Sequence, residues 1–343
     1  MRLEIEICGK CNLSCVMCSQ YYGYNGKILT LDEIQDIFNV NGVFDGKVEL
    51  ITLHGSGEPL MHPNFKQVLD MIPPSVNVSF LTNGILLDVM SDIIKNYRNI
   101  VGINISMDAI SDDIYRKIRG GKVYKVTQGI HTLRQALASV ENNIDLTVNM
   151  TLMRINCADV KNMIDFCSDN SLKLAIWPLI SDQAHSDKWI AKRDGWVFNY
   201  KESIISRDEL NDIYASNISY ANSKSVTLVI DDFMSHDNEE GSGVIKCDVF
   251  DYNMLYFSDG SVKHCCLQNG ELFNWRNSNE AFSLNVENQK AIGLKKQGIV
   301  PDLCAGSGCP FVGKKSKSHA QVISIDESGF RGQKITFKRN KLQ

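Results

Sequence analysis

The chain has 343 residues, 43% of them hydrophobic, which is enough apolar surface for one large core or for two domains. A net charge of −4 and a pI near 6.0 give no broad basic field, which argues against nucleic acid as a partner. No segment has the roughly 18 apolar residues of a membrane span, and the first residues lack a signal-peptide pattern, so we expect a cytoplasmic protein without a membrane partner.

Short β-branched runs alternate with longer runs of helical period over the first half of the chain. The predicted strands are residues 3–7, 47–53, 77–81, 101–107, 145–152 and 172–179. The predicted helices between them are residues 31–38, 64–72, 86–97, 126–140 and 159–167. Six β-α units predict an α/β fold with a parallel sheet, either a partial (β/α)6 barrel or an open doubly wound sheet. Ligands are then expected at the carboxyl ends of the strands.

The pattern loosens after the sixth strand. Residues 180–203 are polar with two Trp, and are either a plain linker or a loop over the site. A helix at 206–223 and a strand at 226–231 are expected to close a first domain, residues 1–232. The remainder, 233–343, is predicted to be a smaller α+β domain with a "SDGS" hairpin turn and a solvated basic tail.

The cysteines gather near the two ends of the chain. In a reducing compartment, eleven cysteines arranged in this way favour metal ligation over disulfides. Cys11, Cys15 and Cys18 form C-x3-C-x2-C directly after the first strand, and thiolates are the ligands of iron–sulfur clusters. A zinc site with Cys8 as the fourth ligand is the alternative; otherwise Cys8 is a buried or spare thiol.

A strand followed by this motif, at the head of six β-α units, resembles the radical S-adenosylmethionine (SAM) superfamily. The resemblance implies that Cys11, Cys15 and Cys18 bind a [4Fe–4S] cluster whose open iron chelates SAM. It further implies that reductive cleavage yields a 5′-deoxyadenosyl radical, which removes a hydrogen atom from the substrate. An electron donor of the flavodoxin or ferredoxin type would be the partner.

The segment "HGSGEPLMHP" after the second strand is similar to the glycine-rich element of that superfamily, whose backbone groups accept the methionine ammonium. The cofactor-binding residues implied by this similarity are Gly55, Ser56, Gly57, Glu58 and Pro59. We expect the glycines to allow a close backbone approach and unusual dihedral angles.

Four more residues follow strand ends. Ser106 and Asp108 lie before a segment that we expect to be a loop closing in Arg-Gly. They are assigned to the cofactor, with Asp108 also a catalytic or substrate-binding candidate and a helix or turn cap as its alternative. Arg154 offers a planar fork for a carboxylate, although a surface role is nearly as plausible. Asn83 is either a cofactor contact or a turn residue.

A second cysteine group follows residue 246 and resembles the auxiliary-cluster domains called SPASM and twitch. It contains five cysteines, too few for two further clusters. The resemblance implies one auxiliary [4Fe–4S] cluster, with a small zinc domain as the alternative. The expected ligands are Cys247, Cys265 or its neighbour Cys266, Cys304 and Cys309.

These features predict an enzyme acting on a small polar substrate, with oxidation of a secondary alcohol of a sugar or aminocyclitol as the first hypothesis. The auxiliary cluster would accept one electron. The alternatives are an epimerase in which Cys266 donates a hydrogen atom, a peptide-modifying enzyme, and a non-enzymatic cluster scaffold. We disfavour a peptide because the chain starts at strand one. Candidate substrate contacts are Tyr21, Tyr22, Tyr24, Trp177, Asp182 and His185.

Overall fold

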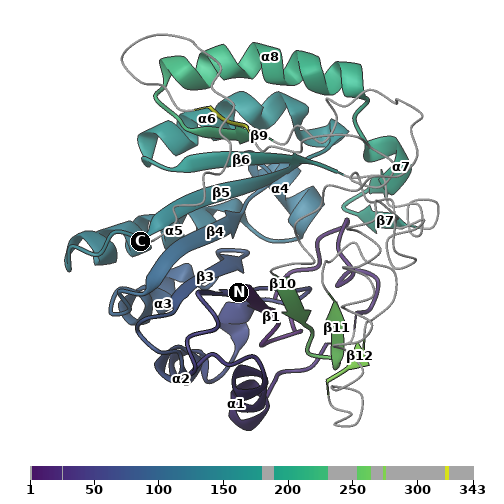
Figure 1. Ribbon diagram of the computed structural model, residues 1–343. Helices are drawn as coiled ribbons and strands as arrows, with labels where there is room; N and C mark the ends of the chain where they lie inside the picture. Colours follow the sequence, from purple (N-terminus) through teal and green to yellow (C-terminus); the bar gives the residue numbers. More distant parts are fainter. Residues whose placement is uncertain are drawn as a thin grey trace, which may run out of the picture.

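The computed structural model describes residues 2–24, 26–179, 189–230, 253–263, 273–275 and 321–323. Its main sheet has eleven strands in the order β12-β11-β10-β1-β2-β3-β4-β5-β6-β9-β13 (Figure 1). The strands are β1 (Arg2–Ile5), β2 (Leu50–Leu53), β3 (Asn77–Thr82), β4 (Ile100–Ser106), β5 (Asp145–Leu152), β6 (Lys173–Pro178), β9 (Leu228–Ile230), β10 (Asn253–Tyr256), β11 (Ser261–Lys263), β12 (Phe273–Asn274) and β13 (Gln321–Ile323). All neighbours from β10 through β9 are parallel, whereas β11, β12 and β13 pair antiparallel.

Helices follow most of the parallel strands and cover one face of the sheet. They are α1 (Leu31–Val40), α2 (Phe65–Met71), α3 (Leu87–Ile94), α4 (Asp112–Arg119), α5 (Val123–Ala138), α6 (Val160–Asp169), α7 (Tyr200–Ser203) and α8 (Arg207–Ser223), with 3-10 turns η1 (Pro59–Met61) and η2 (Arg154–Asp159). Thr30 and Glu33 form a capping box that fixes the start of α1. The six predicted strands, the five predicted helices and the helix at 206–223 are confirmed, and with them the α/β partial barrel.

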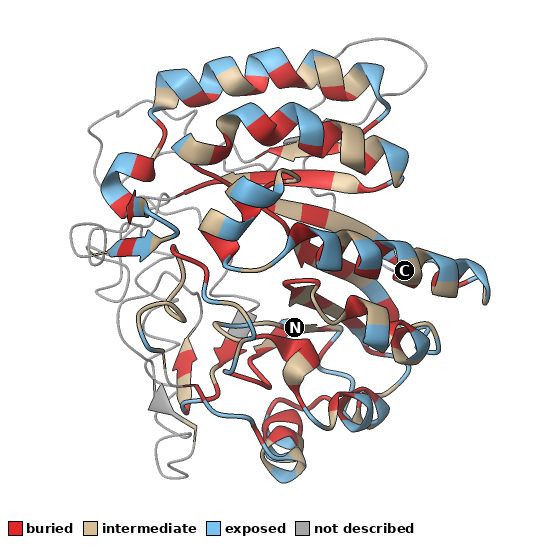
Figure 2. Ribbon diagram, turned by 180° about the vertical axis from the view of Figure 1, so that it is seen from behind, coloured by how far each residue is buried: buried red, intermediate tan, exposed pale blue. Residues whose placement is uncertain are grey.

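The two faces of the central strands differ in polarity. On the side covered by helices the side chains are fully buried and apolar, as in Ile103, Ile105, Val148 and Met150 (Figure 2). On the other face the side chains are half-buried, and along β4 and β5 they are Asn104, Ser106, Thr147, Asn149 and Thr151. Because strand side chains alternate between faces, this sequence pattern builds an apolar core on one side and a polar interior on the other.

The segment after β4 differs from the expected loop, because residues 112–119 form helix α4. Acidic residues occupy its first turn and basic residues its last turn, which complements the helix dipole. Tyr115 and Ile118 anchor it in the core. Gly120 ends the helix with φ 78°, the left-handed conformation that glycine adopts without strain.

Within residues 180–203 the structure describes a β-hairpin made of β7 (Ile190–Arg193) and β8 (Trp196–Asn199). Asp194 and Gly195 both have positive φ, at 51° and 77°, as a two-residue hairpin turn requires. Phe198 and Ala191 of this hairpin are buried in a small second core. Val16 joins them from the cysteine loop, the segment after β1 that carries Cys11, Cys15 and Cys18. The prediction for residues 180–203, a plain linker or a loop over the site, stays a prediction, because residues 180–188 lie outside the described residues.

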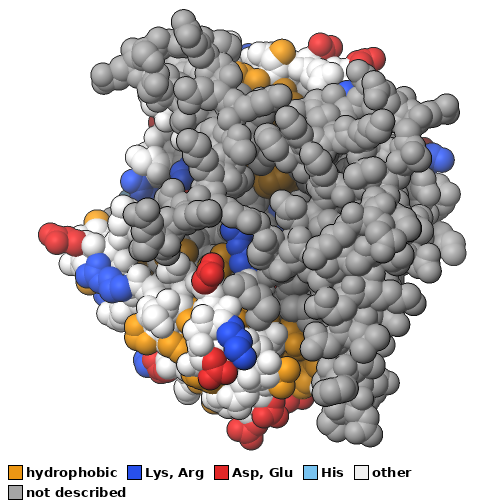
Figure 3. Space-filling model, in the orientation of Figure 1, with side chains coloured by type: hydrophobic (Ala, Val, Ile, Leu, Met, Phe, Trp, Pro, Cys, Tyr) orange, Lys and Arg blue, Asp and Glu red, His pale blue; other side chains and the backbone are white. Residues whose placement is uncertain are grey.

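The predicted "SDGS" turn is confirmed between β10 and β11. Because β10 pairs in parallel with β1, this hairpin continues the sheet of the barrel. Most of residues 233–343 lies outside the described residues, so the division into two domains stays a prediction. No helix in the described ranges has the length and apolar character to span a membrane. On the face shown in Figure 3, described cationic and anionic side chains are interspersed, without a one-sign patch.

Candidate cluster and cofactor site

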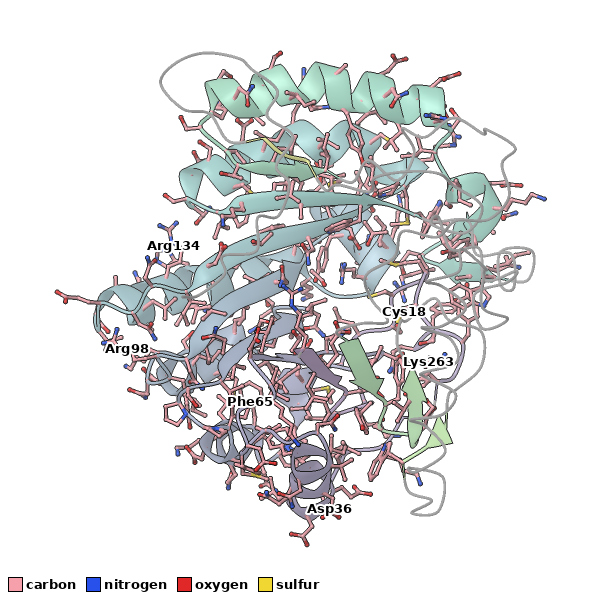
Figure 4. All side chains as sticks on the ribbon, viewed as in Figure 1. Cys18, Asp36, Phe65, Arg98, Arg134 and Lys263 are labelled. Atoms are coloured by element: carbon pink, nitrogen blue, oxygen red, sulfur yellow. The ribbon has the colours of Figure 1, made fainter. Side chains whose placement is uncertain are left out.

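Cys11, Cys15 and Cys18 lie on the loop that follows β1. Figure 4 shows Cys18 of this loop at the carboxyl edge of the sheet. The pKa of the Cys15 thiol is raised to about 12, chiefly by burial, while the nearby Arg119 guanidinium acts in the opposite direction. Burial also raises the pKa of Cys11, with Cys18 contributing. All three thiols lie on one loop, with three residues between Cys11 and Cys15 and two between Cys15 and Cys18. A set of three thiols fits an iron–sulfur cluster, in which each thiolate binds a separate iron.

Cys8 does not join this group. It is 1% exposed, and its thiol donates to the Lys10 carbonyl at 3.5 Å. Burial raises the pKa of its thiol to about 11. In the described ranges no three His, Cys, Asp or Glu side chains are arranged for a single metal ion, and this holds for Cys11, Cys15 and Cys18 as it does for Cys8. Cys8 is therefore a buried thiol, which removes the fourth ligand that the zinc alternative requires.

Cys11 is held by a chain of contacts that begins at Glu58. The Glu58 carboxylate is 2% exposed. It accepts from the Asn83 backbone amide at 2.6 Å and from the Thr82 hydroxyl at 2.7 Å. The Asn83 side chain donates to Asn12 Oδ1 at 2.6 Å and to Cys11 Sγ at 3.5 Å. Glu58 thus acts inside the protein, and Asn83 is the residue that reaches the cysteine loop.

The glycine-rich loop packs tightly on the end of β1. A Cβ on Gly57 would overlap the Cys8 carbonyl oxygen, and one on Gly55 would overlap the Glu6 side chain. Neither glycine has a positive φ. The expectation of unusual dihedral angles is therefore wrong; glycine is required here because the loop approaches the neighbouring chain closely. Pro59 is buried at the start of η1.

Cys15 is contacted by an arginine that the sequence analysis did not assign. Arg119, at the end of α4, is 6% exposed and donates from Nη1 to Cys15 Sγ at 3.9 Å. Its Nε lies 2.7 Å from Asp108 Oδ2. Asp108 is fully buried, and its Oδ1 accepts from the Thr151 amide at 2.8 Å. Asp108 is thus neither a helix cap nor exposed to a substrate: it pairs with Arg119 behind the cysteine loop.

A second arginine clamps the loop from the β7–β8 hairpin. Arg193 donates to the Lys117 and Ile118 carbonyls at the end of α4, both at 3.1 Å. Its Nη2 donates to the Ser14 carbonyl and, at 2.9 Å, to the Ser14 hydroxyl. A cation at a helix carboxyl end is favourable, and here it also ties the helix to the residue before Cys15.

The three tyrosines proposed as substrate contacts hold the loops in place. Tyr21 OH donates to the Lys192 carbonyl at 2.9 Å. Tyr22 OH donates to the Val16 carbonyl at 3.0 Å, and its ring stacks on Trp189 with centroids 4.6 Å apart. Tyr24 OH donates to Glu6 at 2.7 Å. Their hydroxyls are therefore engaged within the protein.

Ser106 and Trp177 are both half-buried at the carboxyl ends of β4 and β6. Ser106 stands opposite Asn149 in the strand register, on the polar face of the sheet. Among the described residues its hydroxyl has no hydrogen-bond partner. This placement leaves Ser106 available to a ligand in the interior.

Arg154 has other partners. Its guanidinium donates to both carboxylate oxygens of Glu209, at 2.6 and 3.1 Å, and to the carbonyls of Glu202 and Ile204. Half of its side chain is exposed. The expected carboxylate partner is thus one of the protein's own, and Arg154 is left out of the candidate site.

The second cysteine group cannot be located in the structure. Its members Cys247, Cys265, Cys266, Cys304 and Cys309 lie outside the described residues, as do Asp182 and His185.

A cavity of about 650 Å³ opens at the opposite edge of the sheet, where Val101, Asp145 and Lys173 lie at the starts of β4, β5 and β6. Arg134 also lines it and lies far from Cys18 in Figure 4, so this cavity is separate from the candidate site.

A sequence profile described as the Radical SAM superfamily matches residues 5–167. The chain is 31% identical over 175 residues to a probable GTP 3′,8-cyclase of Methanocaldococcus jannaschii, which covers 49% of this chain and 55% of that protein. It is 35% identical over 151 residues to the GTP 3′,8-cyclase of Alkaliphilus oremlandii, covering 41% of this chain and 46% of that protein. The chain thus spans about half the length of these curated relatives.

Two solved structures share the fold. Streptococcus suis SuiB bound to S-adenosylmethionine superimposes with a TM-score of 0.62 at 13% identity, over 86% of this chain and 67% of that chain. The structure of anSMEcpe with bound AdoMet gives a TM-score of 0.57 at 18% identity, over 86% of this chain and 83% of that one. At these identities the likeness establishes the architecture alone.

Proposed function

We propose that this chain, whose residues 5–167 match the Radical SAM superfamily profile, is a radical SAM enzyme that holds a [4Fe–4S] cluster on Cys11, Cys15 and Cys18 and binds SAM beside it. The observation that carries this is the cysteine triplet on the loop after β1, with Asn83 donating to Cys11 and Arg119 donating to Cys15. When bound, the cluster and SAM together supply a carbon radical that removes a hydrogen atom from the substrate.

The chain's own contribution is positioning. Asn83 and Arg119 direct N–H donors at two cysteine sulfurs, and donors to sulfur are one means by which a protein adjusts an iron–sulfur potential. The glycine-rich residues Gly55, Ser56 and Gly57 and the half-buried Ser106 are the proposed contacts for SAM. Inside the protein, Glu58 holds Asn83 in place and Asp108 holds Arg119 in place.

A small polar substrate is the proposed ligand of the barrel interior. The polar face offers hydroxyl and amide groups from Asn104, Asn149 and Thr151 that have no side-chain hydrogen-bond partner in the described residues. In strands β2–β6 the only cationic side chain is Lys173, at the amino edge and paired with Asp145. These groups suit the hydroxyls of a sugar or aminocyclitol, so oxidation of a secondary alcohol remains our first proposal. An auxiliary [4Fe–4S] cluster on Cys247, Cys265, Cys304 and Cys309 would accept the electron released.

The second candidate is cyclisation of GTP, which the names of the curated relatives favour. A triphosphate requires several cationic side chains. Strands β2–β6 do not supply them at the carboxyl edge, and the shared region covers only about half of those relatives. We therefore rank GTP cyclisation below alcohol oxidation. Epimerisation with Cys266 as the hydrogen donor is the third outcome that the same assay can reveal.

The first test is anaerobic reconstitution followed by reduction and assay of 5′-deoxyadenosine. We expect wild type to cleave SAM and to hold about eight iron atoms per chain, as two cubane clusters require. Replacing Cys11, Cys15 and Cys18 by Ala should abolish cleavage and remove about half of the iron. The matched control is Cys8→Ala, which removes a buried thiol three residues away and should retain both. Full iron content without cleavage in wild type would instead support the scaffold alternative.

The second test identifies the substrate class. Purified enzyme is incubated with a panel of polyols and aminocyclitols, with GTP, and with short peptides, in heavy water. A ketone product without carbon-bound deuterium supports the dehydrogenase, whereas deuterium incorporation that is lost in Cys266→Ala supports the epimerase. Conversion of GTP alone would replace our first proposal by the second. An electron donor of the flavodoxin or ferredoxin type should support turnover in place of a chemical reductant.

A further inference from the structure

Glu6, directly after β1, is a buried carboxylate that joins three segments far apart in the sequence. It is 1% exposed. Its Oε1 accepts from Tyr24 OH at 2.7 Å, and from the amide and hydroxyl of Ser258 at 3.2 and 2.5 Å. Its Oε2 accepts from the Ser56 amide and, at 3.3 Å, from the Gly57 amide. In the described part of the chain it forms no ion pair, so neutral donors alone compensate its burial.

These donors come from the cysteine loop, the glycine-rich loop and the turn of the β10–β11 hairpin. Ser258 is separated from Glu6 by 252 residues and is fully buried. Its hydroxyl also accepts from the Lys27 amide at 3.0 Å. The hairpin therefore docks on the barrel through the same carboxylate that holds the glycine-rich loop (Figure 1, where β10 lies beside β1).

The bonds to Glu6 fix which way the glycine-rich loop presents its carbonyls. A trans peptide directs its N–H and C=O groups to opposite sides, and the described chain has no cis peptide. With the Ser56 amide directed at Glu6, the Gly55 carbonyl must point away from it. The Gly55 carbonyl has no hydrogen-bond partner among the described residues, whereas the Ser56 carbonyl accepts from Gln20 at 2.8 Å. A carbonyl fixed in this way is an acceptor for a cationic amine.

We propose that Glu6 is a positioning residue that couples the docking of the β10–β11 hairpin to the shape of the glycine-rich loop, so that Ser258 contributes to SAM affinity. The inference rests on the proposed function insofar as residues 55–57 contact SAM. The coupling itself is independent of that function, because it depends only on the bonds that Glu6 makes.

The test uses the anaerobically purified full chain and two measurements. Hydrogen exchange of the Ser56 and Gly57 amides without SAM reports on loop positioning, and equilibrium dialysis gives the Kd for SAM. Glu6→Gln replaces one acceptor oxygen by a donor, and we expect much faster exchange and roughly tenfold weaker SAM binding with unchanged iron content. Ser258→Ala should move both quantities in the same direction, by roughly threefold.

The matched control is Glu4→Gln, two residues before Glu6 and within β1, where the carboxylate pairs with His54 at 2.8 Å instead. It should leave the exchange of Ser56 and Gly57 and the SAM affinity unchanged. If Glu6→Gln fails to fold, Ser258→Ala decides the matter. Wild-type exchange and affinity in Ser258→Ala, or equal effects of the Glu4 and Glu6 variants, would overturn the proposal. If wild type binds no SAM, the proposed function fails, while the exchange measurement still tests the coupling.

Discussion

Two buried carboxylates flank the cysteine loop and are compensated in different ways. Glu58 accepts from two backbone amides and the Thr82 hydroxyl, all neutral donors, and burial raises its pKa to about 7. Asp108 instead pairs with the guanidinium of Arg119 at 2.7 Å. The stability of the Glu58 site depends on the protonation of that one carboxyl group. The stability of the Asp108–Arg119 pair depends on two opposite charges being buried together.

Each carboxylate serves a different cysteine. Glu58 holds Asn83, which donates to Cys11, and Asp108 holds Arg119, which donates to Cys15. The loop is therefore supported from β3 on one side and from α4 on the other. Removing the ionic support should therefore cost far more of the free energy of unfolding than altering the neutral one.

The largest effect is expected from Arg119→Met, which leaves the Asp108 charge buried without its partner. Breaking such a pair costs about 3–5 kcal/mol of the free energy of unfolding. Chemical denaturation of the anaerobic protein measures this. The double variant with Asp108→Asn should be less destabilised than the sum of the two single variants, because it leaves no buried charge unpaired. Strict additivity would show that the two side chains do not interact, and Asp108 would then not be stabilised by Arg119.

The second effect concerns pH and Glu58. Because its pKa is raised to about 7 in the folded chain, the folded state binds this proton more tightly than the unfolded state, whose Glu pKa is near 4.5. The contribution of Glu58 to the free energy of unfolding is complete below pH 4.5 and is lost as the pH rises to about 7. It amounts to at most about 3 kcal/mol. We expect the stability difference between wild type and Glu58→Gln to change across this window. A constant difference from pH 4.5 to 7 would show that Glu58 is ionised throughout.

Local sequence patterns predicted the frame of the molecule but little of what holds the site. The six strands and the cysteine triplet are readable because β-branched runs, helical periods and short spacings are local properties. Helix α4 was missed because the resemblance assigned this segment to a loop, although Ile114, Tyr115 and Ile118 recur at the three- and four-residue spacing of a helix. The hairpin turn at Asp194 and Gly195 had a signal, the Asp-Gly pair, that was not used.

The supporting residues escaped prediction because their partners are remote. Arg119 reaches Cys15 across 104 positions and Arg193 reaches Ser14 across 179. An "RGG" pattern marked Arg119 only as the end of a loop. Glu6 looked like one polar residue in an alternating strand. No local rule distinguishes such residues from surface charges, so only the fold assigns them a role.

The third effect is expected from Arg193→Ala, which releases the cysteine loop from the end of α4. Loss of an outer support around a metal site typically weakens retention by roughly tenfold or more. We expect iron loss to a chelator to become roughly tenfold faster, while the far-ultraviolet circular dichroism stays unchanged. The matched control is Arg116→Ala. The Arg116 side chain joins the same helix and hairpin through Asp194, at 3.6 Å, and among the described residues it has no hydrogen bond or ion pair with the cysteine loop. Equal iron loss in both variants would assign the effect to hairpin docking in general.

The smallest effect is expected from Arg154→Ala. Its bidentate pair with Glu209 is exposed to solvent, where ion pairs are screened and contribute little. Sequence reasoning placed this arginine at the cofactor, whereas its contacts tie η2 to the start of α8. We therefore expect the Kd for SAM and the rate of 5′-deoxyadenosine formation to match wild type. A marked loss of SAM affinity, with thermal stability retained, would return Arg154 to the site and require its pair with Glu209 to open when the cofactor binds.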